Sequence, residues 1–246
     1  MIRFLIPFVL GATAAQAGSG GLCDLQDDDL IFTSCGGAAV ELRLLPEDAE
    51  ATPEGALDVT GAYTATDRRA ENRRKPVGLF ARGGEVISRE YVRFDGVLTV
   101  TDGQPTLHHR RRIVFNDQQF DLENTKDRAD FLSRASETGS AVMQSHLLIV
   151  DGNVDTAPVD GAPRFRRRIL FQMNDGTFGV FDSSPRMLTL NEATQEVAAK
   201  FAPNMALNLD MGSYDFCRKG QSLCGALGPQ STGKLSNLLR FTKPGG

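Results

Sequence analysis

The chain lacks several features that would assign it to a common functional class. After Ala17 it has no apolar run of about 18 residues, the length that crosses a bilayer as a helix, so we expect no membrane span. Its formal net charge of −4 at pH 7 excludes a generally basic nucleic-acid binder. It has three histidines and no G-x-S-x-G, H-E-x-x-H or G-x-x-x-x-G-K motif, so the usual nucleophile, zinc-protease and phosphate-loop signatures are missing.

The first residues have the pattern of an export signal. Arg3 precedes the apolar stretch Phe4 to Ala12, and Ala15-Gln16-Ala17 has the small-residue spacing of a cleavage site. We therefore expect a signal peptide at residues 1–17 and a periplasmic or secreted mature chain. With 41% apolar and 24% charged residues, the sequence has the composition of a globular domain.

Four cysteines fit this oxidising compartment, where disulfides are the expected use of paired thiols. Cys23 and Cys35 follow the expected signal, and Cys217 and Cys224 lie toward the C-terminal end. Of the three possible pairings we favour the local one, Cys23–Cys35 with Cys217–Cys224, over the two crossed ones. Zinc binding is less favoured, because no CxxC pair is present and oxidation consumes the thiolates that zinc needs.

Most of the chain has the patterns of strands. Short apolar or alternating runs predict strands at 40–44, 97–100 and 147–150, and Asp-Gly turn signals follow the last two. Residues 168–173 and 177–181 flank Asn174-Asp175-Gly176, which predicts a hairpin.

Two segments have the patterns of helices. One covers about residues 126–136, after Asn124-Thr125 as a possible N-cap. The other begins at a capping box of Thr189 and Glu192, continues to Phe201 and is followed by Pro203. Because strands outnumber helices and the two do not alternate, we predict an α+β fold, a single domain of mixed, mostly antiparallel twisted sheet with a few helices.

Basic residues are clustered, although the chain as a whole is acidic. The clusters lie at 68–69, 73–75, 110–112 and 164–168. Guanidinium groups bind phosphate and carboxylate through two parallel hydrogen bonds, so such clusters are candidates for anion recognition. The alternative, which we favour for any single cluster, is a solvated strand edge whose charges block unwanted pairing. Along a strand, at most half of the 164–168 cluster can face one site.

The run 206–210 carries two polar groups among apolar ones. Asn208 and Asp210 are two residues apart, so on a strand they share one face, with Leu207 and Leu209 on the other. Such a strand can present a carboxylate to a substrate. The equally favoured alternative is that Asp210 begins a turn before Gly212 and bonds to nearby backbone.

Several short blocks occur in a characteristic order. They are Val59-Thr60-Gly61-Ala62-Tyr63 with 75–80, Phe94-Asp95-Gly96-Val97-Leu98, Gln144-Ser145 with 148–152, Arg167 ahead of Asp175-Gly176, the helix at 189–201, and Ala206-Leu207-Asn208-Leu209-Asp210. In this order they resemble the phosphodiester glycosidase family. The resemblance implies a phosphodiester glycosidase-like core at 57–216, after an N-terminal segment at 18–56 with Cys23 and Cys35, and before a disulfide loop and tail of the same domain at 217–246.

The resemblance implies an exported hydrolase that cleaves the bond between a sugar's anomeric carbon and a phosphodiester. It implies Asp210 as general acid or base, Arg167 as the group that neutralises phosphate, and Asn208 as the residue that orients a sugar hydroxyl or Asp210. The substrate-binding residues that it implies are Gln144, Ser145, His146, Thr60, Gly212 and Ser213. The partner is then a small carbohydrate or glycosyl phosphate, with no cofactor and no required metal.

The sequence departs from the family pattern at three places. Thr60 replaces an asparagine, His146-Leu147 stand where the family has Gly-Pro, and Met211 interrupts a glycine run. Two other functions therefore stay open, namely binding of a glycosyl phosphate or envelope component without turnover, and an envelope protein with no ligand. His146 is a further candidate acid because histidine titrates near neutral pH, although a structural role is more common. The sequence leaves the oligomeric state open.

Overall fold

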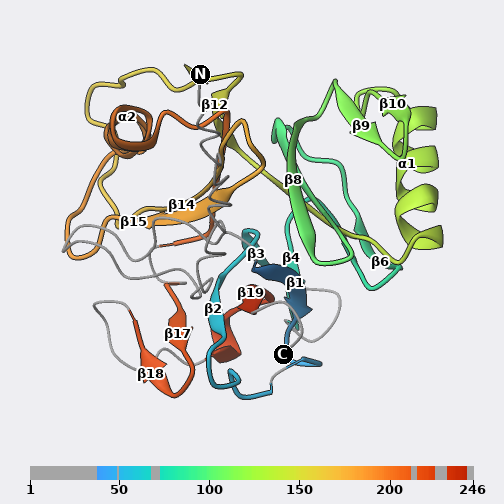
Figure 1. Cartoon of the computed structure of the whole chain (residues 1–246), viewed down its shortest axis with the longest axis horizontal. Coiled ribbons are helices and arrows are strands. Elements are labelled where there is room, and N and C mark those ends of the chain that lie inside the picture. The colour runs from blue at the N-terminus through green and yellow to red at the C-terminus, as the bar shows by residue number, and fades with distance from the viewer. Residues whose placement is uncertain (1–37, 49, 68–72, 212–214, 225–231, 243–246) are drawn as a thin grey trace, which may run out of the picture.

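The computed structural model describes residues 38–48, 50–67, 73–211, 215–224 and 232–242. Three five-stranded sheets carry the fold (Figure 1). In all strand pairs of this described part, the partners are antiparallel. The described part of the chain is therefore a mostly antiparallel β structure.

The first sheet brings together strands from near both ends of the described chain. Its order is β1 (Ala39–Leu44), β19 (Asn237–Thr242), β2 (Leu57–Thr60), β17 (Cys217–Lys219) and β18 (Ser222–Leu223). The second sheet has the order β6 (Glu85–Arg89), β5 (Leu79–Arg82), β11 (Ala141–Ser145), β7 (Gly96–Thr101) and β8 (Gln104–His109).

The third sheet carries the run singled out in the sequence. Its order is β13 (Asn153–Val154), β12 (Leu147–Val150), β16 (Met205–Asn208), β14 (Arg168–Gln172) and β15 (Phe178–Asp182). The smaller elements are the pair β3 (Thr64–Asp67) and β4 (Arg73–Pro76), the pair β9 (Ile113–Phe115) and β10 (Gln118–Phe120), and a 3-10 turn at Thr232–Lys234.

The two helices cover different sheets and lie on opposite sides of the molecule (Figure 1). Helix α1 (Thr125–Glu137) contacts β5, β6 and β11 of the second sheet, and α2 (Leu190–Phe201) contacts β12 and β13 of the third. Both begin where the sequence predicts. The Asn124 side chain accepts hydrogen bonds from the amides of Lys126 and Asp127, and Thr189 and Glu192 form a complete capping box.

Alternation along the strands explains how the sheets share one core. On β14, Leu170 packs into a central cluster to which all three sheets contribute, whereas Ile169 and Phe171 face the cluster beneath α2. On β11, Met143 faces the central cluster and Val142 faces the cluster beneath α1. Since successive residues of a strand point to opposite faces, each buried strand serves two apolar layers.

Most predicted elements are confirmed. The segments expected as strands are parts of β1, β7 and β12, and β14 and β15 form the expected hairpin, with Gly176 at a φ of +84° in its turn. The mostly antiparallel sheet with two helices agrees with the predicted class, but strands dominate so strongly that the label α+β fits only loosely. The domain boundaries stay a prediction.

The C-terminal cysteine pair is confirmed. Cys217 and Cys224 form a disulfide with their Cα atoms 4.9 Å apart, which excludes both crossed pairings. Cys23 and Cys35 lie outside the described residues, as does the expected signal peptide. Within the described ranges, neither helix is long and apolar enough to span a membrane.

Candidate functional site

Asn208 and Asp210 lie at the end of β16 and face the segment that joins β2 to β3. The Asp210 amide donates to the Gly61 carbonyl (2.9 Å), and the Thr64 amide donates to Oδ2 of Asp210 (3.0 Å). The Asn208 side-chain amide donates to the hydroxyl of Tyr63. Both polar side chains therefore face residues 63–64, as the spacing predicts.

The facing segment is held in place from the first sheet. The Asn237 side chain accepts a hydrogen bond from the Ala62 amide (2.7 Å) and donates one to the Ala62 carbonyl (3.1 Å). A Cβ atom at Gly61 would lie 2.4 Å from Oδ1 of Asn237, so only glycine allows this approach. Tyr63 and Thr64 are thus fixed opposite the two polar groups of β16.

Burial determines the protonation of Asp210. The residue is 5% exposed, and this burial raises the pKa of its carboxyl group to about 7, against the opposing effect of hydrogen bonds from the Thr64 and Met211 amides. Near neutral pH this carboxyl group can therefore either donate or accept a proton.

Three aromatic side chains lie beside these groups. The ring centroids of Tyr63 and Phe94 are 5.2 Å apart, those of Phe94 and His146 are 4.3 Å apart, and those of Tyr63 and His146 are 6.1 Å apart. We call Tyr63, Phe94 and His146 the three-ring cluster. All three residues are partly exposed, and the amide of Asn208 donates to the His146 carbonyl (2.9 Å), which places the cluster next to β16.

His146 is neutral in this setting. Burial lowers the pKa of its imidazole, and the nearby Asp95 carboxylate only partly opposes this effect. The distance between Nδ1 of His146 and Oδ1 of Asp95 is 3.9 Å, while that carboxylate oxygen accepts a hydrogen bond from the Leu147 amide (2.8 Å). His146 therefore offers a neutral ring rather than a ready acid.

Arg167 differs from the other arginines of its cluster. Arg164 pairs with Glu192, Arg166 with Asp215, and the fully buried Arg168 with Asp182 and Asp215. Among the residues that the structure describes, Arg167 has no carboxylate partner.

Arg167 binds two backbone carbonyls and acts electrostatically on Tyr63. Its Nε and Nη2 atoms donate to the carbonyls of Leu188 (3.0 Å) and Pro163 (3.1 Å). Its positive charge favours the ionised form of Tyr63, although burial and the Asp210 carboxylate together raise the pKa of this tyrosine. The arginine that the resemblance implies for phosphate therefore acts on the same tyrosine as Asp210.

Three predicted substrate-binding residues are buried and bonded within the protein. Gln144 accepts from the Leu79 amide and donates to the carbonyls of Val92 (2.9 Å) and Phe94 (2.8 Å). Ser145 donates to the Asn208 carbonyl (2.6 Å), and Thr60 accepts from the Phe216 amide (3.0 Å). These side chains thus support the backbone around β16 and the three-ring cluster, and their contact with a substrate stays a prediction.

The remaining predicted substrate-binding residues, Gly212 and Ser213, lie outside the described residues. Sequence reasoning missed Phe94 and the role of Tyr63. Each occurs in a matched block, but nothing local to either block indicates that the two rings meet His146. Only the packing of separate strands brings them together.

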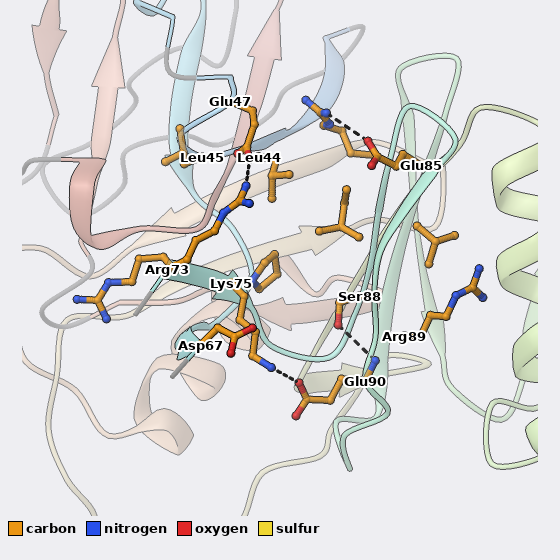
Figure 2. A pocket seen from close by; sticks show the side chains of 15 residues that line it. Leu44, Leu45, Glu47, Asp67, Arg73, Lys75, Glu85, Ser88, Arg89 and Glu90 are labelled. Carbon is orange, nitrogen blue, oxygen red and sulfur yellow. Dashed lines mark hydrogen bonds and ion pairs between the residues drawn. The ribbon is translucent and has the colours of Figure 1, made fainter. Parts of the chain in front are cut away.

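A hollow of about 630 Å³, apart from these residues, lies between the hairpins β3–β4 and β5–β6 (Figure 2). Its lining includes the basic residues of the cluster at 73–75, but Arg73 pairs with Glu47 and Lys75 with Glu90. Arg110 and Arg111 pair with Glu123, and Arg112 pairs with Asp151. These clusters fit the alternative of charged strand edges.

Within the described ranges no group of three or more His, Cys, Asp or Glu side chains is arranged to hold a metal ion.

Comparisons with known proteins show a distant relationship of fold. No family model and no curated protein sequence matches the chain. The catalytic domain of zebrafish N-acetylglucosamine-1-phosphodiester alpha-N-acetylglucosaminidase, auto-inhibited by its pro-peptide, is similar with a TM-score of 0.53 and 11% identity over 83% of this chain and 73% of its own.

Two bacterial structures show the same level of likeness. A hypothetical protein from Synechocystis gives a TM-score of 0.54 and 13% identity, over 84% of this chain and 57% of its own. An exported protein from Burkholderia pseudomallei gives a TM-score of 0.56 and 12% identity, over 84% of this chain and 71% of its own. The fold that the resemblance implies is therefore present.

Proposed function

We propose that the protein is an exported hydrolase of the phosphodiester glycosidase family, which cleaves a sugar-1-phosphodiester bond. The observation that carries this proposal is Asp210, a carboxyl group with a pKa of about 7 that lies with Asn208 beside partly exposed rings. The zebrafish domain of similar fold is named as a phosphodiester glucosaminidase, which supports this reaction class.

The chemistry assigns one role to each group. Water attacks the anomeric carbon, the bond from this carbon to the phosphate oxygen breaks, and the phosphate leaves with the electron pair. Because a phosphate monoester is a stable anion near neutral pH, the leaving group needs charge neutralisation more than a proton. We assign Arg167 to the leaving phosphate and the ionised form of Asp210 to the proton of the attacking water. Asn208 orients a sugar hydroxyl.

A second candidate function is binding of a glycosyl phosphate without turnover. The observation that favours it is the low exposure of Asp210, which is 5%, next to Met211 in place of a family glycine. In this case Arg167 and Asn208 hold a ligand that no water attacks.

Incubation of the mature chain with a panel of sugar-1-phosphodiesters, nucleotide sugars included, tests the proposal through the release of free sugar. Asp210→Asn abolishes release, whereas Asp151→Asn, which changes an exposed carboxylate paired with Arg112, does not. Binding without release, lost in Arg167→Ala, establishes the second candidate. If neither release nor binding occurs, both functions are wrong.

Export is proposed from the signal pattern, the disulfide and the exported protein of similar fold. N-terminal sequencing of the protein from a periplasmic or culture fraction tests it. A first residue of Gly18 is the expected result, and retention of Met1 in the cytoplasm contradicts it.

A further inference from the structure

The three-ring cluster has two properties beyond its position. Its rings tilt against one another, with interplanar angles of 39° for Tyr63 and Phe94, 60° for Phe94 and His146, and 82° for Tyr63 and His146. They also stay partly exposed, with 44% of the His146 side chain open to solvent. Rings that only fill a core are covered, as Phe131 and Phe171 are in the layers beneath the helices.

Side-chain hydrogen bonds hold this cluster in place. The Phe94 carbonyl accepts a hydrogen bond from the buried Gln144 side chain, and the next residue, Asp95, binds the amide of Leu147. Tyr63 is held through its hydroxyl by Asn208. A cluster whose rings are fixed before any ligand arrives loses little conformational entropy on binding.

One buried acceptor at the cluster is left without a partner. Asn208 is 3% exposed, and its Oδ1 atom makes no hydrogen bond to any residue that the structure describes, while the amide nitrogen of the same group binds the Tyr63 hydroxyl. A buried acceptor without a partner is unfavourable, and a hydroxyl donor satisfies it. The site thus combines aromatic faces with a vacant hydrogen-bond acceptor.

A pyranose has the complementary chemistry, because its ring carries apolar C–H faces and a rim of hydroxyl groups. We propose that Tyr63, Phe94 and His146 form the subsite for the sugar ring, and that Asn208 Oδ1 accepts a hydrogen bond from one sugar hydroxyl. This subsite rests on the proposed function, in which Asp210 and Arg167 act on the bond between the sugar and the phosphate. In this arrangement the three rings contact the sugar, and the guanidinium group of Arg167 contacts the phosphate.

The test separates the two halves of the ligand. The probes are four methyl pyranosides (gluco, galacto, manno and N-acetylglucosamine), which carry no phosphate, and glycerol 1-phosphate, which carries no sugar. Binding is measured by two-dimensional NMR titration of the mature chain, which also shows whether each variant is folded. Phe94→Leu keeps an apolar side chain and removes the aromatic face, and Phe201→Leu is its matched control, because Phe201 stacks on Phe171 in the layer beneath α2.

At least one pyranoside binds the wild type, and Phe94→Leu weakens this binding about threefold to tenfold, the effect of losing one aromatic contact. Phe201→Leu leaves pyranoside binding unchanged, while Arg167→Ala weakens the binding of glycerol 1-phosphate more than that of the pyranoside. The absence of pyranoside binding, or equal loss in Phe94→Leu and Phe201→Leu, overturns the subsite. Pyranoside binding without hydrolysis of any phosphodiester upholds the subsite and rejects the hydrolase. Hydrolysis of a sugar phosphodiester with an unchanged KM in Phe94→Leu upholds the hydrolase and rejects the subsite.

Discussion

Asp210 shows how one residue joins stability to chemistry. Its pKa rises from 3.8 to about 7 because the folded protein buries it, so the native state favours the neutral carboxyl group. This preference contributes fully to stability below pH 3.8 and is lost as the pH rises through 7, where the native state must hold a buried charge. A general base at this position therefore works at the expense of stability.

Asp210→Asn tests this relation. Because asparagine does not ionise, the free energy of unfolding of the variant exceeds that of the wild type at pH 8 by an amount on the order of 2 kcal/mol. At pH 4 the two proteins have similar stability. Urea unfolding at both pH values measures the difference. For the proposed hydrolysis by the wild type, kcat rises with pH to a plateau above about 7, since the proposal assigns the role of base to the ionised form. A kcat that falls above pH 7 makes Asp210 an acid instead, and equal unfolding curves at pH 8 contradict the burial argument.

His108 has the opposite dependence. It is 8% exposed, its ring bonds to the Thr99 hydroxyl (2.9 Å), and burial lowers its pKa from 6.5 to about 4. The neutral ring thus stabilises the fold fully above pH 6.5, and this contribution is lost as the pH falls through 4. His108→Gln flattens the fall in unfolding free energy between pH 6.5 and 4 by an amount on the order of 2 kcal/mol. His109→Gln, measured by the same urea titrations, is the control, and an identical slope in the two variants refutes the assignment.

At the scale of elements, the capping box of α2 matters because this helix covers the third sheet, which contains β16. Thr189→Ala removes the side-chain acceptor for the Glu192 amide and lowers the free energy of unfolding by about 1 kcal/mol. Thr106→Ala, at an exposed position of β8, costs less than half as much and serves as the control. Thermal unfolding followed by circular dichroism measures both. Equal effects of the two changes exclude a specific role of the cap.

Local patterns predict elements well but predict neighbours in space poorly. The capping residues of α1 and α2, the β14–β15 hairpin and the shared face of Asn208 and Asp210 all follow from spacings of a few residues. The three-ring cluster does not, because Tyr63, Phe94 and His146 come from separate segments that only the packed sheets bring together. Gln144 and Ser145 illustrate the same limit. The sequence shows two polar residues on a strand, and only the fold reveals that both are buried supports.

At the scale of the whole molecule, Arg168 joins the third sheet to the first. It donates to Asp182 on β15, to Asp215 and to the Phe216 carbonyl, and the Phe216 amide donates to Thr60 on β2. The sequence places Arg167 and Arg168 in one cluster and cannot separate them. Strand alternation turns Arg168 into the interior, where it is fully covered, and leaves Arg167 without a carboxylate partner in the described part of the chain. The same junction fixes the β2 end that leads to residues 61–64, opposite Asp210.

Arg168→Met should therefore be among the most damaging single changes in the molecule. It removes the shared cation, so the buried Asp182 loses its ion pair with Arg168 and the buried Asp215 keeps only its pair with Arg166, which costs about 3–5 kcal/mol. Arg112→Met, which breaks an exposed pair with Asp151, costs less than about 1 kcal/mol. Urea unfolding of both variants measures the difference.

The origin of this loss can be separated from packing. If it comes from carboxylates left without the Arg168 cation, the triple variant with Asp182→Asn and Asp215→Asn recovers part of the stability, because both buried carboxylates are removed, although Arg166 then loses its partner Asp215. If instead the guanidinium acts mainly through its volume, the triple variant is no more stable than Arg168→Met. Recovery of stability without recovery of sugar-phosphodiester hydrolysis would show that Arg168 does more than offset charge, since the arginine also holds the Phe216 carbonyl and, through it, the strand that leads to the site.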